Sequence, residues 1–284
     1  MTIRRILFRS TVRLMERLIL VQKPTSKTVE NLSLGRLPDG NRHTDIITIA
    51  FNNSRIIPLH TRLLAANFGG EHTHIVADNS TDPVASREIR DYCRREGIAY
   101  VRLPKNRLGK TAGPSYSHAA ALNYCYRNIV CHRQPCYFGI TDHDLFLLKP
   151  VQLAPILDRQ NVYGPQRRRD DYWYLSGIMS FFKFAYTCGR KVDFMPVTYN
   201  GTYLDSGGGN WKGLYRGLDT SGMTFCAERM DHIAEGDDRH QDMVEIFDER
   251  WLHTINGSYW KKVAIEKENI LDQLIEKYTA ELNA

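Results

Sequence analysis

Two aspartates that flank a histidine, Asp142-His143-Asp144, lie between two apolar runs, Tyr137 to Thr141 and Leu145 to Leu148. Ionised carboxylates at the end of a buried strand are unfavourable unless a positive partner compensates for the lost hydration, and a divalent cation is the usual partner. Aspartate is also common in tight turns, where its side chain bonds the nearby backbone. The motif alone leaves a metal site and a simple turn open, so the surrounding elements must distinguish them.

The chain before this motif alternates between β-prone and helical segments from residue 45 onward. Short apolar runs predict strands over 46–51, 74–77, 99–103 and the stretch that ends at Asp142. Helical patterns fill the intervals at 56–67, 84–96 and 115–126. This alternation predicts an α/β fold with a mostly parallel, Rossmann-like central sheet and helices on both faces, because parallel neighbours need crossover connections.

Three of these four strands end in polar clusters. The clusters are Asn52-Asn53, Asp78-Asn79 and Asp142-His143-Asp144. The carboxyl ends of parallel strands share one edge of the sheet, and ligands of such sheets bind there. The sequence therefore predicts that all three clusters meet at a ligand site.

Composition limits the class of protein and of partner. The 284 residues are 42% hydrophobic and 25% charged, which is typical of one large globular domain or two small ones. A net charge of +6 favours an anionic partner such as nucleic acid, a membrane surface or a phosphorylated small molecule. No stretch approaches the roughly 20 apolar residues of a membrane-spanning helix. Scattered cysteines without a CxxC pair, and no signal peptide, predict a cytoplasmic protein with reduced thiols.

The first 44 residues differ from the remainder. Arginines recur at every fourth position, namely Arg5, Arg9, Arg13 and Arg17. An opposing apolar stripe consists of Ile3, Leu7, Leu14, Leu18 and Val21. We therefore expect a basic amphipathic helix over residues 1–21, followed by a polar connector that reaches residue 44. Such a helix can lie on the anionic inner face of a membrane or dock its apolar stripe on the protein, and the sequence leaves both open.

Beyond Pro150 the pattern is less regular. Strands are predicted over 161–165 and 172–184, with the basic cluster Arg167-Arg168-Arg169 between them. A helical pattern follows at 212–218, and a C-terminal helix with apolar spacing is predicted over 263–284.

The strand-end motifs resemble a known family. Ile47 to Asn53, followed by Ile75 to Asp82, resembles the opening of family 2 glycosyltransferases, and Asp142-His143-Asp144 matches the Asp-x-Asp motif of that family. The resemblance covers about residues 45 to 260 and implies the GT-A fold of nucleotide-diphospho-sugar transferases. It implies a nucleotide-binding half over 45–150 and an acceptor-binding half over 151–262. The segment Thr-Ala-Gly-Pro-Ser-Tyr-Ser-His after Lys110 departs from the Gly-Ala-x-x-Asn-type sequence more usual in the family.

The resemblance also implies a set of donor contacts and metal ligands. The expected nucleotide-sugar contacts are Phe51, Asn52, Asn53, Asp78, Asn79, Lys110 and Asp142. The expected ligands of Mn²⁺ or Mg²⁺ are Asp142, Asp144 and His253, the last from a late segment in which a family histidine returns to the metal. For Lys110, which shares its loop with Lys105 and Arg107, a solvated basic loop is the alternative to a phosphate contact.

An inverting transferase also needs a carboxylate that takes the proton of the acceptor hydroxyl. Asp205, before three consecutive glycines, is our candidate because an acid of the resembled family occupies this point. Its alternative role is to cap a helix that starts near Asn210. Other carboxylates in the same half leave the assignment open, namely Glu228, Asp231, Glu235, Asp237 and Asp238.

These expectations together predict a metal-dependent, inverting glycosyltransferase that moves a sugar from a nucleotide-diphosphate donor to a hydroxyl of a glycan or glycolipid. One alternative is a sugar-phosphate nucleotidyltransferase, although Asn52-Asn53-Ser54-Arg55 is not the Gly-rich basic loop that such enzymes use for a triphosphate. The other is a non-catalytic sugar or nucleic-acid binding protein, for which the basic residues are too dispersed to form a stripe. We therefore expect no nucleic-acid partner.

Overall fold

The computed structural model describes residues 3–232, 243–255 and 270–283. In this part of the chain the central sheet has seven strands in the order β1-β4-β3-β2-β5-β10-β7. Its parallel strands are β2 (Thr44–Ala50), β3 (His72–Asp78), β4 (Ala99–Arg102) and β5 (Tyr137–Asp142). The strands with antiparallel pairing are β1 (Val29–Glu30), β10 (Met179–Lys183) and β7 (Val162–Tyr163).

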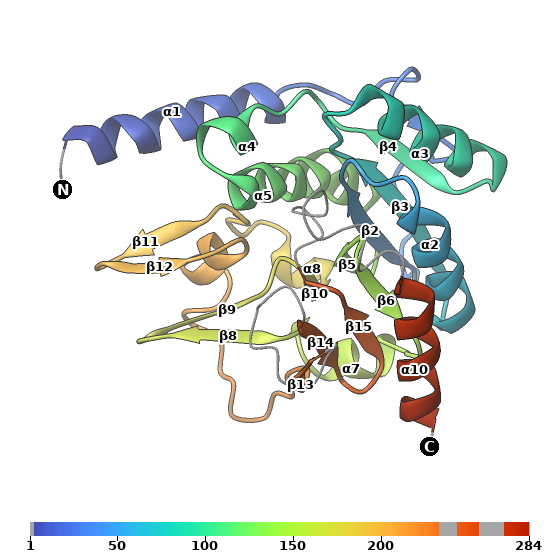
Figure 1. The fold of residues 1–284 in the computed structure, drawn as a ribbon. Helices are drawn as coiled ribbons and strands as arrows, with labels where there is room; N and C mark the ends of the chain where they lie inside the picture. Colours follow the sequence, from blue (N-terminus) through green and yellow to red (C-terminus); the bar gives the residue numbers. More distant parts are fainter. Residues whose placement is uncertain (1–2, 233–242, 256–269, 284) are drawn as a thin grey trace.

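Helices cover both faces of this sheet (Figure 1). They are α2 (Ile56–Asn67), α3 (Pro83–Arg95) and α5 (Pro114–Cys125). On one face, Val76 and Tyr100 pack with Ile57 of α2 and Ile89 of α3. On the other face, Ile47, Ile49 and Ile75 pack with alanines of α5. Successive strand residues alternate between these two cores, so the predicted α/β class and mostly parallel sheet are confirmed.

A second sheet begins directly after the acidic motif. It has the order β13-β14-β15-β6. Its strands are β13 (Glu228–His232), β14 (Met243–Phe247), β15 (Trp251–His253) and β6 (Leu145–Leu147). Helix α10 (Leu271–Asn283) packs its Leu271, Leu274 and Tyr278 on this sheet. The predicted C-terminal helix is thus present from residue 271, and residues 263–269 lie outside the described part.

Shorter elements connect these layers. Two hairpins are built from β8 (Gln166–Arg169) with β9 (Tyr172–Leu175) and from β11 (Val197–Tyr199) with β12 (Thr202–Leu204). The short helices are α4 (Leu108–Thr111), a π-helical turn (Tyr126–Val130), α6 (Cys131–Arg133), α7 (Ala154–Arg159), α8 (Phe184–Thr187) and the 3₁₀ helix η2 (Gly208–Trp211).

Two predictions for the part of the chain beyond Pro150 were wrong. The single strand expected over 172–184 is divided into β9 and β10, because residues 176–178 turn the chain from one sheet to another. Residues 212–218 form turns and not a helix. A Cβ atom at Gly213 would lie 1.9 Å from the carbonyl oxygen of Lys191, so close packing sets the chain path here.

Helix α1 (Ile3–Leu20) runs above α4 and α5 (Figure 1). It docks through Val12, Ile19 and Leu20, which are all buried. The apolar stripe, for which the sequence left docking and membrane contact open, does not dock but faces outward: Leu7, Leu14, Leu18 and Val21 are 62%, 59%, 58% and 68% exposed. The helix therefore carries two apolar faces, and the stripe identified from the sequence is the one left in solvent.

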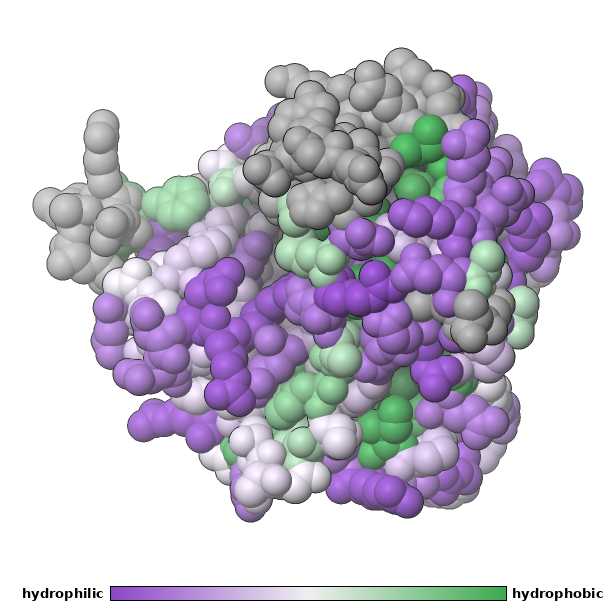
Figure 2. All heavy atoms as spheres, turned by 60° about the horizontal axis from the view of Figure 1, so that its bottom comes forward, coloured by the Kyte–Doolittle hydropathy of each residue, from purple (hydrophilic) through white to green (hydrophobic). Residues whose placement is uncertain are grey.

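Two surface properties complete the description. Hydrophilic residues predominate on the face shown in Figure 2, where apolar residues form separate small groups. Within the described ranges, none of the helices has the length and apolar character needed to cross a membrane.

Candidate active site

The ends of three parallel strands lie at one edge of the central sheet, as predicted. In the register of the sheet, Ala50 at the end of β2 pairs with Asp78 at the end of β3. On the other side of β2, Ile49 pairs with Asp142 at the end of β5. The polar segments after these strands are therefore neighbours.

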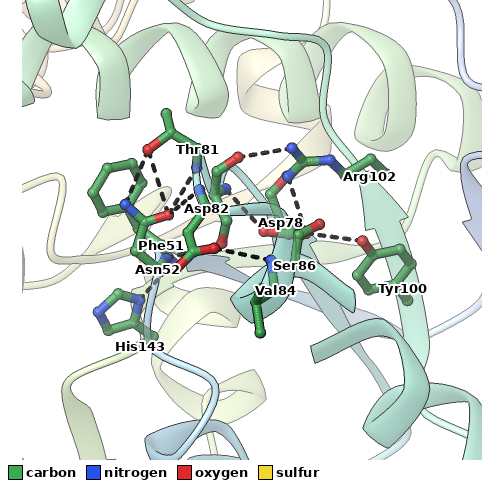
Figure 3. A network of polar contacts seen from close by, with 11 residues as sticks. Phe51, Asn52, Asp78, Thr81, Asp82, Val84, Ser86, Tyr100, Arg102 and His143 are labelled. Carbon is green, nitrogen blue, oxygen red and sulfur yellow. Dashed lines mark hydrogen bonds and ion pairs between the residues drawn. The ribbon is translucent and has the colours of Figure 1, made fainter. Parts of the chain in front are cut away.

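Asn52 joins the loop after β2 to the loop after β3 by hydrogen bonds (Figure 3). Its Oδ1 accepts hydrogen bonds from the backbone N–H groups of Thr81 and Asp82, both at 2.8 Å, and its Nδ2 donates to Thr81 Oγ1 at 3.0 Å. Asn52 has a φ of 53°, in the left-handed region that asparagine tolerates better than most residues. The amide thus holds the loop after β2 against the loop after β3.

Asp78 is fully buried beneath the same loops (Figure 3). Its Oδ1 accepts from the backbone N–H of Ser80 at 2.8 Å, and its Oδ2 accepts from Ser86 Oγ at 2.5 Å and the Tyr100 hydroxyl at 2.9 Å. Arg102 Nη1 lies 3.0 Å from the same Oδ2. The carboxylate that was expected to contact the base therefore has its partners inside the protein, and it positions the loop.

The other expected donor contacts differ in their surroundings. The backbone N–H of Phe51 donates to Nδ1 of His143 at 3.0 Å, which ties the first loop to the acidic motif. Asn79 is buried and donates to Ser117 Oγ at 3.2 Å. Asn53 is only 8% exposed, and its Nδ2 has no hydrogen-bond partner within the described residues. Lys110 lies on α4 with an exposed side chain, and no polar contact in the described part joins it to the acids.

Asp142 meets a histidine that the sequence did not single out. His118 of α5 places its Nε2 3.0 Å from Asp142 Oδ1, and its Nδ1 lies 3.3 Å from Ser206 Oγ. Burial lowers the pKa of His118, but the carboxylates of Asp142, Asp205 and Asp144 outweigh burial and raise it above the usual value. His118 therefore links the acidic motif to the segment that contains Asp205. His118 belongs to the Ser-Tyr-Ser-His segment that departs from the family pattern. That departure is the feature of the sequence that could have identified it.

Asp144 lies beside His253, as the metal prediction requires. The two side chains are buried, with His253 Nε2 3.5 Å from Asp144 Oδ1. The other ring nitrogen, Nδ1, lies 2.6 Å from Oε2 of Glu245 on the neighbouring strand β14. Burial lowers the pKa of His253, yet the two carboxylates outweigh it and raise the pKa to about 10.

The contacts continue from Glu245 to the β8–β9 hairpin. Arg167 of β8 donates from Nη2 to Glu245 Oε1 at 2.8 Å and from Nη1 to Glu228. Although burial alone raises the pKa of Glu245, its hydrogen bond to His253 and the charges of His253 and Arg167 lower it to about 2. Arg167 is thus paired with carboxylates, whereas Arg168 and Arg169 are exposed. The basic cluster in the sequence identified Arg167 but not its partners, and no local pattern identified Glu245, which lies far from the acids in the sequence.

The donor set suits a hard divalent cation, although it is small. Within the described ranges, no three His, Cys, Asp or Glu side chains gather in a metal-binding group. Asp144 and His253 form a carboxylate–imidazole pair, and Asp142 turns toward His118. Mg²⁺ and similar ions in nucleotide sites are often held by one or two protein carboxylates together with substrate phosphates. A cation bound at Nε2 would displace the ring proton that the raised pKa of His253 implies, and with that proton released the pair fits a cation whose coordination is completed by a diphosphate.

Asp205 follows β12 and has an exposed side chain. Its Oδ1 accepts from the Tyr203 hydroxyl at 3.2 Å, and its backbone N–H donates to the Tyr174 hydroxyl at 3.3 Å. It does not cap a helix, because Gly207 precedes η2 and no side chain caps that helix. Packing requires the glycines that follow: a Cβ atom at Gly207 would lie 2.3 Å from the carbonyl oxygen of Leu175.

The alternative carboxylates are less available where the structure describes them. Glu228 is bound by Arg167, and Asp231 accepts from the Tyr278 hydroxyl at 2.6 Å. Glu235, Asp237 and Asp238 lie outside the described residues.

Comparison with known proteins gives distant likenesses in structure. No protein-family model matches the chain, and no curated protein sequence matches it. A mannosyltransferase, PcManGT from Pyrobaculum calidifontis in complex with GDP-Man and Mn²⁺, is 19% identical over 64% of this chain and 56% of its own length, with a TM-score of 0.36. Residues 1–349 of TarS from S. aureus are 17% identical over 51% of this chain and 48% of that one, with a TM-score of 0.34.

A third solved structure is the galactosyltransferase LgtC in complex with donor and acceptor sugar analogs. It is 16% identical over 49% of this chain and 58% of its own length, with a TM-score of 0.36. The chain therefore spans about half the length of these three proteins. Two of the three are named as sugar transferases, but likenesses at this level do not bear on the activity of this chain.

Proposed function

We propose that the protein is a metal-dependent, inverting glycosyltransferase with a GT-A fold, which moves a sugar from a nucleotide-diphosphate donor to a hydroxyl of a glycan or glycolipid. One observation carries the proposal. Asp142 and Asp144, His253 and the segment of Asp205 come from distant parts of the chain and are joined by short polar contacts at the carboxyl edge of the sheet. Each has the chemical type that glycosyl transfer from a nucleotide sugar needs.

The donor nucleotide lies across the first two loops in this proposal. Phe51 and Asn53 contact the base and ribose, and the unpartnered Nδ2 of Asn53 supports this role because a buried donor without an acceptor is unfavourable until a ligand oxygen meets it. Asn52, Asp78 and Asn79 act mainly by holding the loops in position. Lys110 of α4 either contacts the donor phosphates or remains solvated close to them.

Asp144 and His253 would hold Mn²⁺ or Mg²⁺, with Asp142 beside them. When bound, the cation neutralises the charge that develops on the departing diphosphate. Glu245 keeps His253 in one orientation through its 2.6 Å contact with Nδ1, which leaves Nε2 directed toward Asp144.

The transfer exchanges one bond for another at the anomeric carbon. The bond from this carbon to the diphosphate oxygen breaks, and the nucleoside diphosphate leaves with the electron pair. A bond from the acceptor oxygen to the same carbon forms on the opposite face of the sugar, which inverts the configuration. Asp205 takes the proton from the acceptor hydroxyl, and its exposed position beside Tyr203 supports this role.

The outward stripe of α1 gives the protein a peripheral contact with the inner face of a membrane. The stripe combines four exposed apolar residues with the neighbouring exposed Arg17. A helix with apolar residues on one side and arginines beside them lies in the interface of an anionic bilayer. A glycolipid acceptor would then be reached at the membrane surface.

Calorimetric titration with UDP, GDP and dTDP, each with Mn²⁺, tests the proposal. We expect one nucleotide to bind, and Asp144→Ala to weaken it by at least about tenfold because the variant removes a proposed cation ligand. Asp91→Ala is the matched control, since Asp91 is an exposed carboxylate of α3 far from the motif in sequence. Absence of binding by all three nucleotides, or unchanged affinity in Asp144→Ala, contradicts the proposal.

A further inference from the structure

Two paths of contacts join the acidic motif to the segment that contains Asp205, and the first runs through side chains. His118 Nε2 lies 3.0 Å from Asp142 Oδ1. The other ring nitrogen, Nδ1, lies 3.3 Å from the hydroxyl oxygen of Ser206, the residue directly after Asp205. Asp142 and Ser206 are far apart in the sequence, and one imidazole ring spans the distance between them.

The second path runs through the backbone of the turn at 176–178. The N–H of Asp142 donates to the carbonyl of Ile178 at 2.9 Å, and the N–H of Gly177 donates to the carbonyl of Ser206 at 3.2 Å. A Cβ atom at Gly177 would lie 2.6 Å from Ser206 Oγ, so the turn packs closely against the serine. Because strand pairing fixes the backbone of Asp142 in β5, this path sets where Ser206 lies but does not respond to what binds the Asp142 carboxylate.

Helix α5 fixes the backbone of His118 to the donor side of the site. The hydroxyl of the preceding residue, Ser117, accepts a hydrogen bond from Asn79 Nδ2 at 3.2 Å. The backbone carbonyl of Ser117 accepts another from Asn106 Nδ2 at 2.8 Å. Since Asn79 belongs to the loop after β3, the base of the His118 side chain is held by the same loops that would hold the donor.

The carboxylate that His118 contacts is open to a ligand. The side chain of Asp142 is 25% exposed and that of His118 is 19% exposed. In the proposed function, Asp142 lies beside the cation and the donor. A ligand that restrains this carboxylate therefore also restrains the ring against it, and the ring in turn restrains Ser206, because groups in one polar network lose their freedom together.

We propose that His118 is a positioning residue, which makes the placement of Asp205 depend on whether the donor and its cation occupy the acidic motif. The inference rests on the proposed glycosyltransferase function and adds a form of regulation to the same site. His118 acts through Asp142 and Ser206 and not on the reacting atoms. The proposed base is then restrained most strongly when a sugar is present for transfer.

Amide hydrogen exchange, followed by mass spectrometry, tests this role without an acceptor. The full-length protein is compared with and without Mn²⁺ and whichever of UDP, GDP and dTDP binds in the titration above, at saturation. The amides of residues 207–210 are suitable reporters, because each donates to a backbone carbonyl. We expect the nucleotide with Mn²⁺ to slow their exchange in the wild type by at least about fivefold, the low end of couplings between sites in proteins.

Two variants interrupt the side-chain path. His118→Ala removes the ring, and Ser206→Ala removes only the hydroxyl that the ring contacts, which keeps the test decisive if the larger change disturbs folding. Each should reduce the slowing at 207–210 to less than about twofold. Slowing in the loops after β2 and β3 should persist and shows that the nucleotide is bound. A residue that served the fold alone would speed exchange equally with and without nucleotide, so the ratio of the two rates would not change.

His132→Ala is the matched control, because His132 of α6 is an exposed histidine outside both paths. It should retain the full slowing at 207–210. The role of His118 is overturned if bound nucleotide leaves the exchange of these amides unchanged in the wild type. Slowing that persists in His118→Ala or in Ser206→Ala overturns it as well, and so does an equal loss in His132→Ala.

The calorimetric titration separates this inference from the function on which it rests. A nucleoside diphosphate that binds with Mn²⁺ without any response at 207–210 contradicts only the role of His118. Failure of all three nucleotides to bind contradicts the transferase, and the positioning role is then lost with it.

Discussion

At the ends of β2 and β3, side chains bond one loop to the next, whereas Asp205 has an exposed side chain with a single recorded hydrogen bond. Asn52 and Asp78 make seven hydrogen bonds of 3.0 Å or less between them, five to the loop after β3, one to Ser86 of α3 and one to Tyr100 of β4. Asp205 makes one side-chain hydrogen bond that the structure records, to Tyr203. Loops that are already bonded to each other lose little conformational freedom when a ligand binds, so the ends of β2 and β3 are pre-organised.

Under the proposed function, this difference means that the donor site is largely formed before binding, whereas selection of the acceptor depends on a few residues around Asp205. It also predicts opposite consequences of substitution. Changes on the donor side should damage folding as well as binding, and changes on the acceptor side should damage transfer while the fold remains intact. The following variants test that contrast, beginning with the largest expected effect.

Asp205→Asn should lower the rate of sugar transfer by about 100- to 10,000-fold, because an amide cannot accept the acceptor proton. Affinity for the nucleotide with Mn²⁺ and the free energy of unfolding should stay within error of the wild type, since the side chain is exposed. Transfer is measured with a radiolabelled donor at saturation. Transfer within threefold of the wild-type rate would mean that another carboxylate is the base.

Asp78→Asn should lower the free energy of unfolding by about 3 kcal/mol, because it removes the carboxylate paired with Arg102 beneath the loops. Urea unfolding gives the value, and Asp91→Asn on the exposed side of α3 should change it by less than about 0.5 kcal/mol. A fully stable Asp78→Asn variant that has lost nucleotide binding would show instead that Asp78 contacts the base directly.

Acid should destabilise the core below the donor loops through His60. This ring is buried, and its Nε2 lies 2.9 Å from Thr48 Oγ1. Burial lowers the pKa of His60 from 6.5 to about 4. Between these two pH values the imidazole is protonated in the unfolded chain and neutral in the native state. The contribution of the neutral ring to the free energy of unfolding is therefore fully present above pH 6.5, and about 3 kcal/mol of it is lost as the pH falls to 4. Urea unfolding at pH 7 and pH 4.5 measures the loss, and His60→Gln should reduce it; an unchanged loss contradicts the assignment.

Glu245→Gln should weaken Mn²⁺ binding by about 10- to 100-fold, because Glu245 orients His253 from the side opposite Asp144. The readout is the Mn²⁺ electron paramagnetic resonance signal in the presence of the nucleotide, without any acceptor. Glu245→Asp, which retains the charge at a shorter reach, should lose less. If Gln and Asp behave alike, Glu245 serves only to hold β14 and the β8–β9 hairpin together.

Leu18→Glu should reduce binding to vesicles that contain anionic phosphatidylserine by about tenfold, because it removes one exposed apolar residue and adds a repelled charge. Removal of the whole helix is a poorer test, since it would uncover the core that Val12 and Ile19 close. Sedimentation with vesicles measures the effect, and nucleotide binding should be unchanged. Equal sedimentation of the variant and the wild type would exclude the stripe as a membrane contact.

Local pattern was sufficient for much of the fold. The predicted helix 56–67 coincides with α2, and the polar ends of β2, β3 and β5 meet because their spacing required parallel strands. These features depend on neighbouring residues and on the rule that parallel strands end at one edge of a sheet, and both can be deduced from the sequence. Asp144 and His253 also lie together as the family resemblance implied.

Features that depend on distant residues could not be predicted. Periodicity marks the apolar faces of α1 but not which face meets α5, so the sequence could not decide whether the stripe of Leu14 and Leu18 docks or stays exposed. The pairing of His118 with Asp142 joins residues 24 positions apart, and Glu245 meets His253 across two strands that no motif identifies. The turn at 176–178 was missed because the Gly177 N–H bonds the distant Ser206 carbonyl at 3.2 Å, a contact that a strand pattern does not reveal.

The acidic motif is also the segment that connects the two sheets. Asp142 ends β5 in the seven-stranded sheet, and Asp144 precedes β6 in the four-stranded one. The backbone N–H of Thr254 donates to the carbonyl of Asp144 at 3.1 Å, so Asp144 moves with β15. The spacing of the two carboxylates is therefore set by how the sheets lie against each other, through contacts such as Phe181 with Trp251, whose ring centroids are 6.2 Å apart. If the site binds a cation as proposed, its affinity for the ion depends partly on these apolar contacts between the two sheets.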